Sequence, residues 1–218
     1  MDPTSPITIA IEVTIARNTP GPFFTRRRKR MTTESEESKR EKVRSRLLSH
    51  MPKNGIAAEI GVWEGKFSRK ILLATEPREL HLIDPWLYQP EFANTGFGRK
   101  KNETRMEEMY REVVSAFADV PAVKVHRAMS TVALEKFPDG YFDWVYIDGN
   151  HNEPFVWDDL ALARRKVKPG GIIAGDDLNW QTAIGAPVKT AVDRLLAELG
   201  PSARLKVIAN QYLIRLPA

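Results

Sequence analysis

From residue 56 onward, short apolar runs alternate with helical segments, and this alternation restricts the fold more than any other feature of the chain. The predicted strands cover 56–60, 80–83, 123–126, 142–147, 171–174, 204–209 and 211–216, and the predicted helices between them cover 67–74, 101–117, 155–167 and 188–199. Alternating strands and helices form a parallel sheet with helices on both faces. The last two strands are almost continuous, so they are predicted to pair as a hairpin that adds an antiparallel strand.

The first 30 residues differ from the rest. Isoleucine and valine alternate with other residues over 7–15, which suits a half-buried strand, and the five residues 26–30 are all basic. One interpretation is an arm that pairs with a partner chain or an anionic surface. The other, which the block of like charge favours, is a poorly ordered extension upstream of a start at Met31. We therefore expect an extension over 1–30 and one domain over 31–218, which begins with a helix over 33–50.

Composition excludes several classes of protein. The basic run at 26–30 carries as many positive charges as the net charge of the whole chain, +5, so the remainder is nearly neutral and nucleic acid is an unlikely partner. The absence of cysteine excludes disulfides, thiolate metal sites and a cysteine nucleophile. No apolar stretch approaches the roughly 20 residues that a membrane helix needs, and no secretory signal pattern begins the chain. The sequence predicts a cytoplasmic protein without membrane partners.

Polar residues at the carboxyl ends of the strands are the candidate site, because parallel sheets bind ligands there. The loop after the first strand carries Glu59, Gly61, Trp63 and Gly65. Its glycines allow a tight turn and a close approach of backbone to a ligand. The phosphate-binding pattern G-x-G-x-x-G is not matched, since Trp63 stands at its middle glycine, and an acid before the loop suits a cationic ligand. An ordinary glycine turn is the alternative.

Asp84 ends the second strand, about 20 residues beyond the glycine loop. An acid at this position commonly holds the ribose hydroxyls of a nucleoside. The alternative is a carboxylate that only caps its own loop.

Three further carboxylates follow the fourth and fifth predicted strands: Asp148, Asp176 and Asp177. Like charges that converge in a cleft are unfavourable, and Mg²⁺ is a hard cation that would relieve the conflict. The alternative is that Asp176 or Asp177 caps a turn. His151 lies in the loop after Asp148 and is a candidate general base, or else a surface histidine without a role.

Two segments are specific enough to indicate a family. They are Phe142-Asp143-Trp144-Val145-Tyr146-Ile147-Asp148-Gly149-Asn150-His151 and Lys168-Pro169-Gly170-Gly171-Ile172-Ile173-Ala174-Gly175-Asp176-Asp177. With the glycine loop and Asp84, they resemble the class I S-adenosylmethionine-dependent methyltransferases, most closely the bacterial small-molecule O-methyltransferases that include the macrocin-type sugar methyltransferases. The metal arrangement is more distantly similar to that of catechol O-methyltransferase.

The resemblance implies a Rossmann-like α/β fold: a seven-stranded, mostly parallel sheet in the order 3-2-1-4-5-7-6, with strand 7 antiparallel, flanked by helices. It implies S-adenosyl-L-methionine as cofactor and a hydroxylated small molecule as substrate. The cofactor residues it implies are Glu59, Gly61, Trp63, Gly65, Asp84, Met129, Ser130 and Asp148. The implied Mg²⁺ ligands are Asp148, Asp176 and Asp177, and the implied base is His151.

Other functions are compatible with the sequence. These are a metal-independent methyltransferase that acts on nitrogen or protein, a nucleotide-binding oxidoreductase, and a non-catalytic binding module that depends on the basic arm. The missing middle glycine disfavours the oxidoreductase. The sequence leaves open whether the chain forms a homo-oligomer.

Overall fold

The computed structural model describes residues 38–93, 95–183 and 185–218. The chain divides after Arg40 into two units, and the fold described below is that of the second, Glu41–Ala218. The described part of the first unit, residues 38–40, is helical. The predicted extension over 1–30 and the domain boundary at residue 31 lie outside the described residues.

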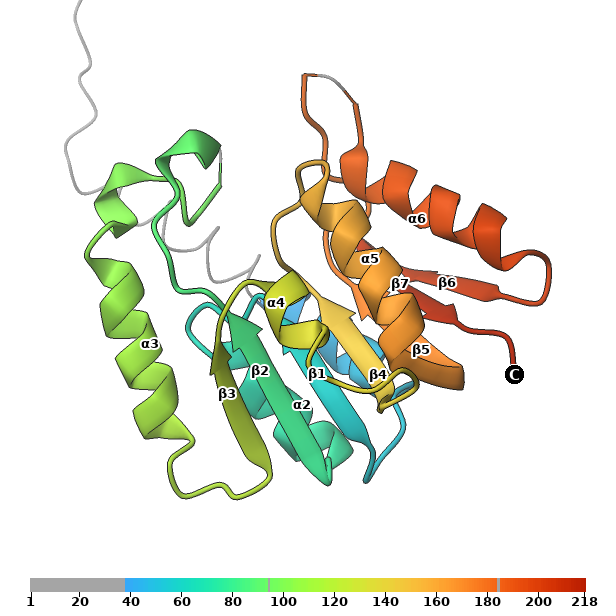
Figure 1. Ribbon diagram of the computed structural model, residues 1–218, viewed down its shortest axis with the longest axis horizontal. Coiled ribbons are helices and arrows are strands. Elements are labelled where there is room, and N and C mark those ends of the chain that lie inside the picture. Colours follow the sequence, from blue (N-terminus) through green and yellow to red (C-terminus); the bar gives the residue numbers. More distant parts are fainter. Residues whose placement is uncertain (1–37, 94, 184) are drawn as a thin grey trace, which may run out of the picture. The chain divides into compact units, whose positions relative to one another are not determined.

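Seven strands form one sheet in the order β3-β2-β1-β4-β5-β7-β6 (Figure 1). Their bounds are β1 Ile56–Ile60, β2 Glu79–Asp84, β3 Val123–Arg127, β4 Phe142–Ile147, β5 Val167–Gly175, β6 Arg204–Ile208 and β7 Gln211–Arg215. Strands β1 to β5 are parallel, whereas β7 runs antiparallel to both β5 and β6. The predicted order and the antiparallel seventh strand are confirmed.

Helices cover both faces of this sheet (Figure 1). The helical residues 41–48, α2 (Lys66–Thr75) and α3 (Arg105–Ala116) share one apolar cluster with one face. The short helix α4 (Ser130–Leu134), α5 (Phe155–Lys166) and α6 (Pro187–Leu199) share a second cluster with the other face. Two 3-10 turns, η1 (Pro90–Phe92) and η2 (Lys100–Asn102), lie between β2 and α3.

The apolar side chains of β4 pack on both faces of the sheet. Trp144 and Tyr146 belong to the first cluster, whereas Phe142, Val145 and Ile147 belong to the second. Successive side chains of a strand point to opposite faces, and both faces of this strand are covered. The next residue, Asp148, is therefore directed to the face that carries residues 41–48.

Three details differ from the sequence prediction. The helix predicted over 101–117 begins only at Arg105, whose guanidinium pairs with Glu108 and Glu112 further along α3. Strand β5 begins at Val167 rather than residue 171, because Val167 pairs with Phe142. The register then shifts, so that Trp144 pairs with Ile172 and the Pro-Gly-Gly segment of β5 lies between the two pairs. The helix α4 was not predicted, since five residues are too few for a helical period to be recognised.

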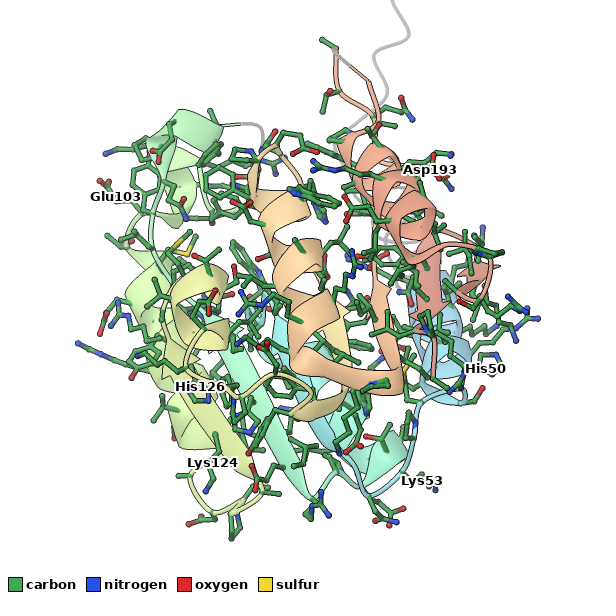
Figure 2. The ribbon with its side chains drawn as sticks, turned by 45° about the vertical axis from the view of Figure 1, so that its right-hand side comes forward. His50, Lys53, Glu103, Lys124, His126 and Asp193 are labelled. Carbon is green, nitrogen blue, oxygen red and sulfur yellow. The ribbon has the colours of Figure 1, made fainter. Side chains whose placement is uncertain are left out.

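The histidines outside the candidate site occupy structural positions. His81 on β2 lies with its Nδ1 atom 2.9 Å from Nε2 of His126 on β3, and its Nε2 atom 3.1 Å from Glu79. Figure 2 labels His126 on this strand, and labels His50 just after the first helix. Burial lowers the pKa of both His81 and His126, which favours neutral rings at these positions. Within the described residues, no helix is long and apolar enough to span a membrane.

Candidate active site

The loops after β1 and β4 meet at the carboxyl edge of the sheet. The backbone N–H of Asp148 donates to the carbonyl of Ile60 at 2.8 Å, and the N–H of Gly61 donates to the carbonyl of Ile83 at 2.9 Å. Gly61 has a φ of +83°, and a Cβ atom there would lie 2.1 Å from the Asp148 carbonyl oxygen. Glycine is therefore required for the turn itself, which places the first glycine of the loop beside Asp148.

Asp84 ties the glycine loop to the end of β2. Its Oδ2 atom accepts hydrogen bonds from the backbone N–H groups of Val62 at 2.9 Å and Trp63 at 3.0 Å. Its Oδ1 atom accepts one from Trp86 at 2.7 Å. Burial raises the pKa of Asp84, and the three backbone donors oppose that shift. A carboxylate offers about four acceptor positions, so Asp84 can hold the loop and still accept a ribose hydroxyl.

The two tryptophans near this loop have different environments. Trp86 is buried in the first apolar cluster and donates from its indole N–H to the Trp63 carbonyl at 2.9 Å. It is a core residue. Trp63 is only half-buried, and its ring lies against Gly96, where a Cβ atom would approach it to 3.2 Å. Trp63 thus remains the candidate to line a cofactor site.

Gly65 and Glu59 are both buried. A Cβ atom on Gly65 would meet Phe117 at 3.2 Å and Val113 at 3.3 Å, so this glycine lets α2 pack on α3. Glu59 is 1% exposed and accepts a hydrogen bond from Ser68. Burial raises the pKa of Glu59 to about 8, despite that hydrogen bond and the nearby positive charge of Arg44. A cationic ligand above this carboxyl would favour its ionised form.

Among the described residues, Arg44 pairs with both Asp148 and Asp176. Nη2 of Arg44 lies 2.8 Å from Oδ2 of Asp148 and 3.2 Å from Oδ2 of Asp176. The guanidinium carbon is 4.5 Å from the centre of the Phe67 ring. Arg44 was not among the residues predicted from the sequence. A signal was present, since Arg44 stands three and four residues before the buried Leu47 and Leu48, on the apolar side of the helix.

His151 lies near the carboxylates of Asp148 and Asp177. Its Nε2 atom lies 3.8 Å from Oδ1 of Asp148 and 3.9 Å from Oδ2 of Asp177, and its ring is 5.5 Å from that of Trp180. Asp177 is held in place by Asn210, whose side-chain N–H donates to Oδ1 at 2.7 Å. The histidine therefore lies at the same edge as the glycine loop, where a base for an acceptor hydroxyl would be needed.

These contacts do not fit the predicted magnesium site. The carboxylates of Asp148, Asp176 and Asp177 do not form one ligand set, because Asp176 is directed to Arg44 and its other oxygen accepts from the N–H of Asp177. Among the described residues, the group whose ligand atoms all lie within 4.8 Å of one another is Asp148, His151 and Asp177. Mg²⁺ prefers oxygen ligands in a near-ideal octahedron, and this group substitutes a nitrogen for one of them.

Met129 and Ser130 lie at the start of α4, which follows β3. The Ser130 hydroxyl hydrogen-bonds to Asp159 of α5, and burial raises the pKa of Asp159 to about 7. A Cβ atom on Gly149 would lie 3.2 Å from Oδ2 of Asp159. Asp159 thus joins α4, α5 and the loop after Asp148, a role that its place in the sequence did not reveal.

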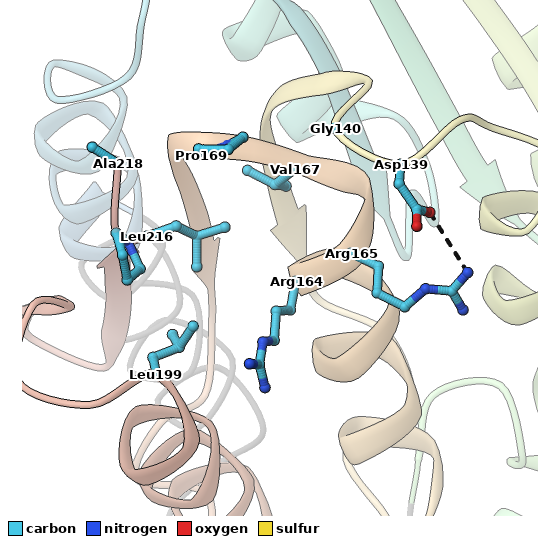
Figure 3. Close-up of a pocket in the computed structure, with 10 residues that line it drawn as sticks. Asp139, Gly140, Arg164, Arg165, Val167, Pro169, Leu199, Leu216 and Ala218 are labelled. Atoms are coloured by element: carbon cyan, nitrogen blue, oxygen red, sulfur yellow. Dashed lines mark ion pairs between the residues drawn. The ribbon is translucent and has the colours of Figure 1, made fainter.

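A hollow at the opposite edge of the sheet does not contribute to this site (Figure 3). It is lined by Asp139 and Val167 at the start of β4 and β5 and by Arg164 and Arg165 at the end of α5. Arg165 pairs with Asp139 across it. The candidate cofactor and base residues all lie at the other ends of the strands.

Comparisons with known proteins identify a family and a fold. A family model described as a methyltransferase domain matches residues 58–178, more than half of the chain and the part that contains the glycine loop, Asp84, Asp148 and His151. A search of curated protein sequences found no match.

Solved structures show the same fold at low sequence identity. A Corynebacterium glutamicum protein has a TM-score of 0.59 at 12% identity, with 92% of this chain and 93% of that chain covered. Spermidine synthase from Thermotoga maritima has a TM-score of 0.51 at 17% identity, covering 78% and 56%. An O-methyltransferase family protein from Burkholderia thailandensis has a TM-score of 0.50 at 12% identity, covering 80% and 55%. At these identities the likeness concerns the fold alone.

Proposed function

Because this chain belongs to the methyltransferase-domain family and is an S-adenosylmethionine-dependent methyltransferase, we propose that it methylates a hydroxyl group of a small molecule. The observation that carries the proposal is the position of His151. Its Nε2 atom lies at the carboxyl edge of the sheet, between Asp148 and Asp177, beside the loop that would hold the cofactor. Methyl transfer to a hydroxyl needs a group that removes the proton, and a positioned imidazole is the usual one.

The cofactor would be held by groups of matching chemistry. Asp84 has acceptor positions for the ribose hydroxyls, and Glu59 lies beneath the glycine loop as a counter-charge for a cationic group. Gly61 and Trp63 form the turn against which the methionine part would lie. Met129 and Ser130, at the start of α4, would flank the adenine. When bound, S-adenosylmethionine supplies an electrophilic methyl group on its sulfonium.

The protein's own residues would orient the acceptor and take its proton. His151 would receive the proton of the acceptor hydroxyl at Nε2 as the oxygen–carbon bond forms and the carbon–sulfur bond breaks, with its electron pair left on sulfur. Alignment of oxygen, carbon and sulfur accounts for much of the rate acceleration in such a transfer. Trp180, whose ring is 5.5 Å from that of His151, would cover the acceptor side.

Metal assistance is the competing version of this proposal. It is the version that the sequence resemblance implies, whereas the contacts of Arg44 with Asp148 and Asp176 favour transfer without Mg²⁺. Chelation separates the two, since only the metal-dependent reaction would stop.

The test is a methyl-transfer assay with S-adenosylmethionine and two acceptor panels, one of sugars and polyphenols and one of amines and peptides. Product formation is followed by mass spectrometry with and without a chelator. We expect methylated hydroxyl compounds in both conditions. Methylation of the nitrogen acceptors alone would contradict the proposed acceptor class. Loss of activity with the chelator would favour the metal-dependent reaction instead.

A further inference from the structure

We infer that the guanidinium of Arg44 occupies the position from which a divalent metal would bridge the carboxylates of Asp148 and Asp176. Arg44 thereby prevents metal ions from binding to this pair of carboxylates. The inference goes beyond the proposed function, and it can be tested separately, because cation binding to this pair of carboxylates can be measured without cofactor or acceptor. Three observations carry it: the contacts of the guanidinium, the charges around it, and the packing of its helix.

The contacts use the same oxygen atoms that a bridging metal would need. One nitrogen, Nη2 of Arg44, lies 2.8 Å from Oδ2 of Asp148 and 3.2 Å from Oδ2 of Asp176. The Arg44 side chain is 15% exposed and that of Asp176 is 6% exposed, so water screens these pairs little. A Mg²⁺ ion about 2.0–2.1 Å from Oδ2 of Asp148 would lie within about 5 Å of the guanidinium nitrogen, because that nitrogen is 2.8 Å from the same oxygen. The two cations would repel each other there, so arginine and metal compete for the pair.

The charges explain why a cation is needed there at all. Asp148 and Asp176 follow adjacent strands, and the buried Glu59 lies nearby and responds to the charge of Arg44. Two carboxylates held together raise each other's free energy unless a cation intervenes. Burial disfavours the charge of Arg44, but the charges of Tyr146, Asp148 and Asp176 together outweigh it and keep the pKa of Arg44 above its ordinary value. The guanidinium supplies the neutralisation that a metal would otherwise supply.

The helix that carries Arg44 is firmly placed. Leu47 and Leu48, one turn further along, are 0% and 3% exposed in the first apolar cluster. The guanidinium also lies over the Phe67 ring of α2, a contact in which arginine is favoured. Displacing Arg44 for a metal would therefore cost both the ion pairs and these contacts, whereas a flexible surface arginine could leave at little cost.

The experiment measures Mn²⁺ binding to the cofactor-free protein from the EPR signal of free Mn²⁺, together with the thermal unfolding midpoint with and without Mn²⁺. The variants are Arg44→Met, which removes the charge and retains helix propensity and length, and Arg44→Met/Asp176→Asn. The matched control is Arg46→Met, an exposed arginine on the same helix.

We expect Arg44→Met to lower the unfolding midpoint without Mn²⁺, and Mn²⁺ to restore it with at least a tenfold gain in affinity over wild type. The added Asp176→Asn change should abolish the gain, and Arg46→Met should behave as wild type. A purely structural arginine would give the destabilisation without rescue by Mn²⁺. Failure of Mn²⁺ to bind Arg44→Met any better than wild type would overturn the inference.

A second comparison decides the question if Arg44→Met does not fold. Mn²⁺ affinity is measured for wild type and for Asp176→Asn, both of which retain Arg44. We expect the two affinities to be equal, because Asp176 is already engaged by Arg44 and cannot serve as a ligand. Weaker binding by Asp176→Asn would show that wild type uses Asp176 for the metal and would contradict the inference, whatever the outcome for methyl transfer.

Discussion

Gly61 lies so close to Asp148 that a Cβ atom at position 61 would come within 2.1 Å of the Asp148 carbonyl oxygen. The obstacle is backbone, which cannot rotate away as a side chain would. The contact fixes the glycine loop against the loop that carries Asp148, Gly149 and His151, so it sets the distance between the predicted cofactor and acceptor sides of the site.

The first prediction follows from this contact. Gly61→Ala adds a collision with backbone to the cost of an alanine at a φ of +83°, so we expect a loss of at least about 2 kcal/mol in the free energy of unfolding. Urea unfolding measures it. The control is Gly140→Ala, which has a φ of +66° but no atom closer than 4.0 Å to the added Cβ. Equal losses for the two variants would show that the loops are not in close contact.

A second prediction concerns the pH dependence of stability. Burial raises the pKa of Asp159 to about 7, above its value of 3.8 in an unfolded chain. The folded protein then binds the proton more tightly than the unfolded chain. The contribution of Asp159 to the free energy of unfolding is therefore fully present below the unfolded pKa and is lost as pH rises through about 7. Between about pH 4 and 7 the slope is at most about 1.4 kcal/mol for each pH unit.

Asp159→Asn should remove this slope, because the amide cannot ionise and its oxygen can still accept from Ser130. Denaturation across that pH range measures the effect. The control is Asp119→Asn, an exposed carboxylate between α3 and β3. Should Asp159→Asn keep the pH dependence of wild type, the carboxyl does not hold its proton in the folded state.

The third prediction tests the proposed base. His151→Asn should lower kcat for a hydroxyl acceptor by about 10²–10⁴-fold, because proton removal by a positioned side chain contributes that much. Its affinity for S-adenosylmethionine should stay close to that of wild type. His50→Asn, just after the first helix, should leave both unchanged. A drop in affinity with unchanged kcat would make His151 a binding residue instead.

Local patterns predicted the fold well because the sheet depends on them. The apolar residues of β4 and the alternation of strands with helices gave the parallel sheet, and the short step between β6 and β7 gave the hairpin. The start of β5 was wrong, because Pro169 and Gly170 are typical of loops and their inclusion depends on the register shift opposite them in β4. The start of a strand like β5 is set by its pairing with the neighbouring strand, and a local sequence pattern does not reveal that pairing.

The candidate site was predicted only where its residues follow strands. Asp84 is joined to the glycine loop by hydrogen bonds to Val62 and Trp63, as its position after β2 suggested. The partner of Asp148 and Asp176 was missed, because Arg44 precedes them by 104 and 132 residues. A helix that precedes the alternating pattern can cover any part of the sheet edge, so its contacts follow from packing rather than from spacing.

The central claim is that carboxylates at the strand ends hold S-adenosylmethionine, and calorimetric titration of that cofactor into wild type and Asp84→Asn tests it most directly. The control is Asp119→Asn, an exposed carboxylate between α3 and β3. We predict that wild type and Asp119→Asn bind one equivalent, and that Asp84→Asn binds at least about tenfold more weakly, a difference of about 1.4 kcal/mol. No binding by wild type, or equal binding by Asp84→Asn, would contradict the account.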